Sequence, residues 1–525
     1  MSAKYIFVTG GVVSGLGKGI ATASLGRLLK SRGYRVALQK FDPYINIDPG
    51  KMSPLQHGEV FVTDDGAQTD LNVGHYERFV DENLSVDSNV TTGKIYWNVL
   101  NNERRGEYGG DTVQVIPHIT SEIKSFIYKL GKSGNSDIVI TEIGGTVGDI
   151  ESQPFLEAIR QVSSEVGVEN AIFIHVTLVP FISGSSELKT KPTQHSVKEL
   201  LSIGIQPQIL ICRSGLELAD DLRAKISLFC NIRSEDVIPH LPADSLYEIP
   251  IMLENEGLAK SVCYHLGIED RKPQLDDWKA MVESEKHPEK HVKVGLVGRY
   301  TALHDAYLST AEALAHAGIS NKVACDITWI STEDVDNDIN CLADCDGILS
   351  IGGRGETSVD SYINIAKFCR ENNKPYFGIG QGMFGAVLDT ARSLAGIDDA
   401  GSSEYGPCTP VIECLVDAIT GEKSISRTGL FPCKIIEGTK LFAIYDDELV
   451  YERHNCCYEI NTAYRAELEN AGLKMSAVSP DGHLTEAVEL ENHRFFIGVQ
   501  FVPQYSSRPN RVHPLFEAFV AELAK

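Results

Sequence analysis

The sequence lacks long apolar runs, clustered cysteines and an excess of positive charge, and each shortage excludes a class of protein. No run of about 18 uncharged apolar residues occurs, so we expect no membrane span. The 48 Lys and Arg against 72 Asp and Glu give a net charge of −24, which disfavours nonspecific nucleic-acid binding. The twelve cysteines are scattered, with one adjacent pair at 456–457, and are expected to be reduced thiols. The first residues lack a signal-peptide layout. We therefore expect a cytoplasmic protein with neither membrane nor nucleic acid as partner.

A nucleophile is also missing from a turn that is shaped to carry one. Residues 378–383, GIGQGM, lie between an apolar run and a predicted helix at 384–394, a strand-turn-helix that points its middle residue into a cleft. Glutamine-hydrolysing domains carry Cys there, and this chain has Gly380. Residues 499–505, VQFVPQY, have the form of the segment that supplies His and Glu, but hold Val502 and Gln504. We expect that this half does not hydrolyse glutamine by the Cys-His-Glu route.

Strand-like runs alternate with helical patterns in two series, which predicts an α/β fold with two doubly wound parallel-sheet domains. The first domain is predicted at 1–267 and the second at 292–525. The charged stretch 268–291, with Pro273 and Pro288, is predicted to be a linker. The strand-like runs are 5–9, 35–39, 138–141, 171–176 and 208–212, and then 292–298, 346–351, 376–379 and 496–501.

Two segments of the first domain indicate phosphate binding. Residues 10–19, GGVVSGLGKG, follow the first strand and open a helix, so that backbone N–H groups and Lys18 would face phosphate oxygens. The loop is not a strict P-loop, because Val12 and Gly19 stand where that motif has Gly and Ser or Thr. With no hydroxyl at position 19, magnesium would need carboxylates, for which Asp42, Asp70 and Glu142 are candidates. The alternative interpretation of residues 10–19 is an ordinary Gly-rich turn that binds no phosphate.

The second segment is 189–195, KTKPTQH, whose two lysines suit a triphosphate tail; a solvated loop is the alternative.

Together these segments resemble those of the CTP synthase family over nearly the whole chain. The resemblance is carried by residues 5–19, by 41–50 (FDPYINIDPG), 52–62 (MSPLQHGEVFV) and 74–79 (GHYERF), and by the loops at Glu142 and Lys189. It implies a P-loop-like amidoligase domain followed by a class I glutamine amidotransferase domain. It also implies ATP-dependent conversion of UTP to CTP, with Mg²⁺, in a homotetramer.

The resemblance further implies roles for individual residues. Lys18 and Lys40 would stabilise the transferred phosphoryl group, and His57 would belong to the ammonia entry. The metal positions are Glu142 and the position that Asn72 occupies. The implied ATP residues are Ser14, Gly15, Leu16, Gly17, Lys18, Gly19 and Arg213. The implied UTP and CTP residues are Ser14, Asp149, Ile150, Glu151, Lys189, Lys191, Gln194 and Lys225.

The sequence departs from the family pattern at several of these places. Asn72 stands where the family has a magnesium-binding Asp, and Gln68 where it has an acid. Ser186 replaces a Gly, Pro242 and Ala243 replace Asp-Val beside the adenine, and residues 453–459 have lost most of a basic, His-rich motif, although glycines at 352–355 remain.

Three hypotheses follow. The chain is a ligase on UTP that uses free ammonia or another small amine, with a silent glutaminase domain. Alternatively, it is a noncatalytic nucleotide-binding paralogue that regulates a true CTP synthase, or a ligase with a changed acceptor or nitrogen donor.

Overall fold

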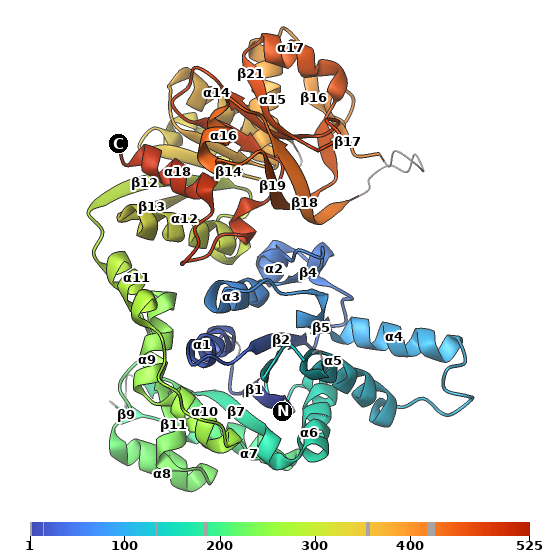
Figure 1. Ribbon diagram of the computed structural model, residues 1–525, viewed down its shortest axis with the longest axis vertical. Coiled ribbons are helices and arrows are strands. Elements are labelled where there is room, and N and C mark those ends of the chain that lie inside the picture. The colour runs from blue at the N-terminus through green and yellow to red at the C-terminus, as the bar shows by residue number, and fades with distance from the viewer. Residues whose placement is uncertain (1–2, 14, 133, 183–186, 353–357, 417–425) are drawn as a thin grey trace. The chain divides into compact units, whose positions relative to one another are not determined.

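A computed structural model describes residues 3–13, 15–132, 134–182, 187–352, 358–416 and 426–525. The chain folds as two units, which are described separately here: residues 1–51 with 72–282, and residues 52–71 with 283–525 (Figure 1). Ser14, Ser186 and residues 353–355, which the sequence analysis singles out, lie outside the described residues. Among the described residues, no helix is both long and apolar enough to span a bilayer.

The N-terminal unit is built on a seven-stranded parallel sheet. Its strands are nearly continuous apolar runs, as expected for strands that are buried on both faces. In the order in which they pair, they are β11 (Val237–His240), β10 (Ile209–Arg213), β7 (Ala171–Leu178), β1 (Lys4–Gly10), β6 (Ile138–Ile143), β2 (Val36–Asp42) and β5 (Asn89–Thr91). Because all pairings are parallel, their carboxyl ends share one edge, where α/β sheets bind ligands.

Helices cover both faces of this sheet (Figure 1). One core packs against α1 (Lys18–Ser31), α3 (Leu71–Val80), α9 (Ile249–Asn255), α10 (Leu258–Leu266) and α11 (Asp276–Lys286). The other core packs against α4 (Thr92–Arg104), α5 (Thr120–Lys132), α6 (Gln153–Val166) and α7 (Lys191–Ser202). A hairpin of β8 (Phe181–Ile182) and β9 (Glu187–Leu188) precedes α7, and α8 (Asp220–Cys230) follows β10. The unit is therefore doubly wound, as predicted.

The interval predicted as a linker is not simply a connector. It contains α11, whose Trp278 is 2% exposed in the core of the N-terminal unit and donates its indole N–H to the carbonyl of Tyr247 at 2.7 Å. The charge of this stretch reflects one solvated helix face, while Trp278 packs against Phe79 and Tyr247 in the core.

The C-terminal unit has a nine-stranded mixed sheet. Five neighbouring strands are parallel: β13 (Val323–Ser331), β12 (Lys290–Gly298), β14 (Gly347–Ile351), β15 (Tyr376–Ile379) and β23 (Phe496–Val499). The sheet continues in antiparallel pairing through β22 (Thr485–Leu490), β21 (Leu473–Val478), β18 (Arg427–Ile435) and β19 (Leu449–Cys456). The parallel half agrees with the expected fold, and the antiparallel half adds to it.

After residue 283, this unit also contains helices and one small sheet. The helices are α12 (Leu308–Asn321), α13 (Thr332–Asn337), α14 (Asp360–Glu371), α15 (Gln381–Ser393), α16 (Lys440–Tyr445), α17 (Arg465–Asn470) and α18 (Pro514–Leu523). The small sheet contains β16 (Ala400–Ser402), β17 (Thr409–Cys414) and β20 (Tyr458–Ile460).

Residues 52–71 come early in the sequence but belong to the C-terminal unit. They form α2 (Pro54–His57) and the hairpin of β3 (Val60–Val62) with β4 (Gln68–Asp70). The backbones approach closely at Gly66 and Gly429, since a Cβ on Gly66 would lie 2.5 Å from the carbonyl oxygen of Thr428. We call residues 52–71 the shared segment.

Candidate nucleotide site and amidase-like elbow

The loop between β1 and α1 has the backbone of a phosphate-binding loop. Gly15 and Gly17 have φ of 75° and 84°, values that glycine adopts without strain. Val12, which stands at the glycine position of the strict motif, has φ of 81°. The loop therefore has the same left-handed backbone at Val12 as at its glycines. This conformation strains a β-branched residue by about 1–3 kcal/mol.

Lys18 begins α1 and folds back across this loop. Its aliphatic chain covers Gly10, where a Cβ would lie 2.4 Å from Lys18 Cδ. Its ammonium donates to the carbonyl of Ile143 at 3.1 Å and to that of Gly145. Burial lowers the pKa of Lys18, and the charge of Glu142 acts in the opposite direction. The lysine is thus held between the phosphate loop and the loop after β6.

Two further strand ends bring Lys40 and Glu142 to the same place. They are paired neighbours on β2 and β6, and both also act on the charge of Lys18. Lys40 Nζ lies 3.3 Å from Asp42 Oδ1, and Asp42 accepts a hydrogen bond from Asn89 Nδ2 at 2.7 Å. Glu142 accepts a hydrogen bond from the hydroxyl of Tyr76. The structure therefore gathers Lys18, Lys40, Asp42 and Glu142, which the sequence predicted, and adds Tyr76 and Asn89.

Asn72 occupies the space that a side chain at position 19 would fill. A Cβ on Gly19 would lie 2.3 Å from Asn72 Oδ1. Asn72 is in the first turn of α3, one turn before Tyr76, which binds Glu142. The missing hydroxyl at position 19 and the neutral amide at position 72 are thus one structural feature.

The described residues implied in pyrimidine-nucleotide binding lie in the loop after β6, in the loop after β9, and on α7 and α8. Lys189 Nζ lies 3.0 Å from Glu187, whose pKa is lowered by Lys189 and also by Lys225. Asp149 caps the loop after β6 by accepting from the N–H of Thr146 at 2.8 Å, while Ile150 and Glu151 are exposed. Lys191 is exposed at the start of α7, and Gln194 donates to the hydroxyl of Thr190 at 3.1 Å.

Arg213 ends β10 and has a partner that the sequence analysis missed. Its guanidinium donates to His240 Nε2 at 2.9 Å and to the carbonyl of Leu241 at 3.2 Å. Burial, together with the charge of Arg213, lowers the pKa of His240 to about 4, so the ring is a neutral acceptor. The His240 ring is also near Gly17 of the phosphate loop. A strand prediction at 237–240 would have pointed to this residue.

The C-terminal unit keeps the backbone of a nucleophile elbow. Gly380 has φ of 60° and ψ of −111° between β15 and α15, and its N–H donates to the carbonyl of Val499 at 2.9 Å. Apart from its two chain neighbours, no heavy atom of the residues that the structure describes lies within 4 Å of where its Cβ would be, so among these residues a side chain would have room. The helix begins at Gln381, earlier than the predicted 384, because the turn feeds directly into it.

Val502 and Gln504 follow the neighbouring strand β23. The N–H of Val502 donates to the carbonyl of Arg453 at 2.8 Å, and Gln504 is buried. Gln68, for which the resemblance implied a place near the metal, donates to Asn455 Oδ1 at 3.1 Å in the C-terminal unit. His57 lies on α2 of the shared segment, with Nε2 3.6 Å from Asp70 Oδ2.

Comparisons with known proteins match both halves of the chain. Residues 4–268 match the family model described as CTP synthase N-terminus, and residues 302–522 match the one described as glutamine amidotransferase class-I. A CTP synthase of Ruminiclostridium cellulolyticum is 58% identical over 99% of this chain and 98% of its own length. A CTP synthase of Clostridium acetobutylicum is 54% identical, with the same coverage.

The chain belongs to the CTP synthase family. Among solved structures, the glutaminase domain of the Trypanosoma brucei protein, with bound acivicin, is 34% identical. It covers 44% of this chain and 94% of its own length, with a TM-score of 0.42.

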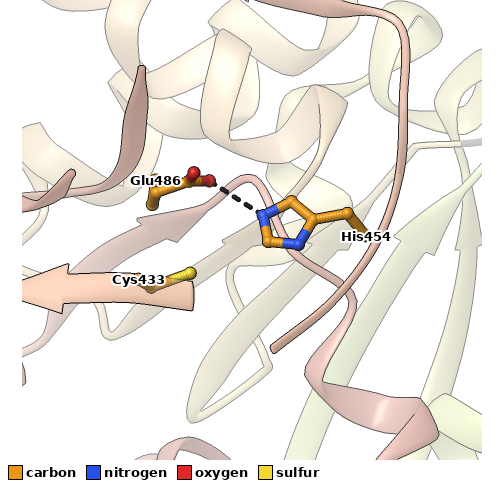
Figure 2. A group of neighbouring side chains, drawn as sticks. All are labelled: Cys433, His454 and Glu486. Carbon is orange, nitrogen blue, oxygen red and sulfur yellow. Dashed lines mark hydrogen bonds and ion pairs between the residues drawn. The ribbon is translucent and has the colours of Figure 1, made fainter. Parts of the chain in front are cut away.

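A cysteine, a histidine and a glutamate do meet in the C-terminal unit, but none of the three comes from the turn at Gly380 (Figure 2). Cys433, His454 and Glu486 are all buried, on β18, β19 and β22. His454 Nε2 lies 2.8 Å from Glu486 Oε2, and Arg427 donates to both oxygens of Glu486, at 2.8 and 3.3 Å.

This cluster is better suited to a structural ion pair than to catalysis or metal binding. Burial raises the pKa of the Cys433 thiol far above its usual range, which suppresses the thiolate that nucleophilic attack or metal ligation needs. Burial alone would raise the pKa of Glu486, but His454 and Arg427 lower it overall. The guanidinium of Arg427 already balances the carboxylate that a metal would require.

Proposed function

We propose that this chain is an ATP-dependent C–N ligase that converts UTP to CTP with free ammonia or another small amine, and not with glutamine. The proposal rests on one contrast. Lys18, Lys40 and Glu142 meet at the carboxyl edge of the first sheet, whereas the elbow of the second unit carries Gly380 without a thiol. We expect the chain to work as a homotetramer, as the family resemblance implies.

The chemistry needs positioning more than covalent catalysis. The γ-phosphoryl group of ATP is transferred to O4 of the uracil ring, ammonia attacks C4, and the C4–O4 bond breaks to release phosphate. Lys18 and Lys40 would balance charge on the transferred group, because preorganised cations stabilise phosphoryl transfer. Lys189, Lys191, Gln194 and Lys225 would hold the triphosphate of UTP, and Arg213 with His240 would lie near the adenine.

The residues present suit a magnesium ion. Asp42 and Glu142 offer anionic oxygens beside the two lysines, and hard Mg²⁺ prefers such ligands. Asn72 would offer only a neutral oxygen. Bound magnesium would offset the charge of the two triphosphates.

The decisive experiment offers the purified chain ATP, Mg²⁺ and UTP with either ammonia or glutamine, and reads the products by mass. We expect CTP with ammonia, and glutamate release from glutamine no faster than in the blank. Glutamate release that follows the protein through purification would contradict the loss of glutaminase activity. Another amine that gives an N4-modified cytosine nucleotide where ammonia fails would favour the changed donor.

Asn72 motivates a second candidate function, a noncatalytic nucleotide-binding paralogue that regulates a true CTP synthase. This candidate predicts binding of UTP, CTP and ATP without turnover. Adding the chain to an active relative should then change the activity of that relative. The mass assay separates the two, since only the ligase produces CTP by itself.

A further inference from the structure

A buried chain of hydrogen bonds lies directly beneath the phosphate loop. His175, on β7, is fully buried. Its Nδ1 lies 2.9 Å from the hydroxyl oxygen of Thr9 at the end of β1, and its Nε2 lies 2.8 Å from the hydroxyl oxygen of Ser196 on α7. The histidine therefore connects the strand that enters the phosphate loop to the helix that begins with Lys191.

The two ring nitrogens must play opposite roles. Burial, with the charge of Lys18, lowers the pKa of His175 to about 3, so the ring is neutral and has one donor and one acceptor. Thr9 can donate its hydroxyl hydrogen to the carbonyl of Ile174 at 3.4 Å, which leaves its oxygen to accept from Nδ1. Ser196 then donates to Nε2. Each hydroxyl is thereby oriented.

Gly11 of the phosphate loop contacts the Thr9–His175–Ser196 hydrogen-bond series directly. A Cβ on Gly11 would lie 1.6 Å from Ser196 Oγ and 2.9 Å from His175 Nε2, so the loop backbone rests on these two side chains. The N–H of Gly11 also donates to the carbonyl of Val176, the residue after His175, at 3.0 Å. A shift of α7 would be transmitted to Gly11 through Ser196.

The first turns of α7 carry the residues proposed to hold the UTP triphosphate. Gln194 is two residues before Ser196 on this helix, and Lys191 is its first residue. Thr193 further fixes the helix by donating to the carbonyl of Leu178 at 3.0 Å. The segment that leads into the proposed ATP loop and the helix proposed to bind UTP are therefore both hydrogen-bonded to His175, through Thr9 and Ser196.

We propose that His175 is a positioning residue that couples the ATP phosphate loop to the UTP-binding helix through Ser196. The inference rests on the proposed function, since it assumes that the two segments bind these two nucleotides. Binding of either nucleotide fixes its own segment, and the Thr9–His175–Ser196 chain then orders the other. Because coupling free energies are reciprocal, each nucleotide should raise the affinity for the other by the same factor.

Calorimetry tests this on the full chain with UTP and a nonhydrolysable ATP analogue, in the presence of Mg²⁺. Each affinity is measured alone and with the other nucleotide saturating. We expect a coupling factor of about fivefold or more for the unchanged chain. His175→Asn keeps a polar group near Thr9 but removes the hydrogen bond between residue 175 and Ser196. Ser196→Ala removes the same hydrogen bond and keeps the one between His175 and Thr9. Both should reduce the factor to less than about twofold, a change that loss of stability alone would not produce.

His265→Asn is the matched control. His265 lies on α10 of the same unit, and its Nε2 is 2.8 Å from Asp236 Oδ2, so this partner is not in the Thr9–His175–Ser196 series. This variant should keep the full coupling factor. If His175→Asn fails to fold, Ser196→Ala decides.

Full coupling in Ser196→Ala overturns the inference. An unchanged chain that binds both nucleotides without coupling overturns the inference and leaves the proposed function standing. A chain that binds neither overturns the proposed function, and the inference with it.

Discussion

Replacing Asp64 by Ala should loosen the shared segment from the C-terminal unit. Asp64 accepts from Arg453 Nε at 2.6 Å, and the Arg453 side chain is only 1% exposed. Arg453 also donates to the carbonyls of Val62 and Tyr505, at 3.1 and 3.2 Å, so it would keep partners after the change.

The magnitude follows from burial. Breaking a fully buried ion pair costs about 3–5 kcal/mol, because the remaining charge is left without its counter-ion. Asp64 is 28% exposed, so water can reach part of the vacated site, and we expect about 2 kcal/mol. Asp64→Asn keeps an acceptor oxygen for Arg453 and should cost less than about 1 kcal/mol.

Hydrogen exchange read by mass spectrometry measures this locally. A loss of about 2 kcal/mol should speed the exchange of amide hydrogens in β3 and β4 by roughly thirtyfold, because these hydrogens exchange through local opening. Glu491→Ala is the control, since it breaks an exposed pair with Lys474 in the same unit. Glu491→Ala should leave the exchange of amide hydrogens in residues 60–70 unchanged. Equal exchange in Asp64→Ala and this control, or an Asn variant as fast as Ala, would refute the reasoning.

Three further predictions concern the site and its surroundings. Lys18→Ala should weaken binding of the ATP analogue at least tenfold, since a charge-assisted hydrogen bond contributes about 1.5–3 kcal/mol; unchanged affinity in calorimetry would contradict this. Asn72→Asp should shift the magnesium dependence of CTP formation to lower concentrations, and a shift to higher concentrations would show that the amide suits the site better. Burial, with the charge of Glu413, raises the pKa of Glu459 to about 7, above the ordinary value of 4.5. Between pH 4.5 and about pH 7, Glu459 is protonated in the folded state and ionised in the unfolded state, so the free energy of unfolding should fall as pH rises through this range. Glu459→Gln should flatten that decline in denaturant titrations, and a decline that persists would contradict it.

Much of the parallel core could be predicted from the sequence because buried strands appear as short apolar runs. The run at 376–379 coincides with β15, and that at 138–141 lies within β6. The three-residue β5 and the four-residue β11 escaped prediction, because so few residues show no periodicity. Missing β11 also hid His240.

The candidate site was predictable where a motif carries it and hidden where distant residues meet. Lys18 and Glu142 were identified from their loops. Tyr76 as the partner of Glu142, and Asn72 as the filler beside Gly19, depend on how α3 packs, which no local pattern specifies. Trp278 was missed because one buried side in a charged helix resembles a solvated linker.

The shared segment limits how this protein can be divided. The main chain passes between the units three times, after residues 51, 71 and 282. A gene fragment that begins at residue 283 would encode the second unit without β3 and β4. Arg453 would then lose its ion pair with Asp64. The backbone N–H of Ser309 would lose the Glu59 carboxylate, to which it donates at 2.8 Å. The second unit is therefore not a cassette that recombination can remove or exchange cleanly. Whatever chemistry the second unit performs, its removal would also take away residues 52–71, which interrupt the first unit in the sequence.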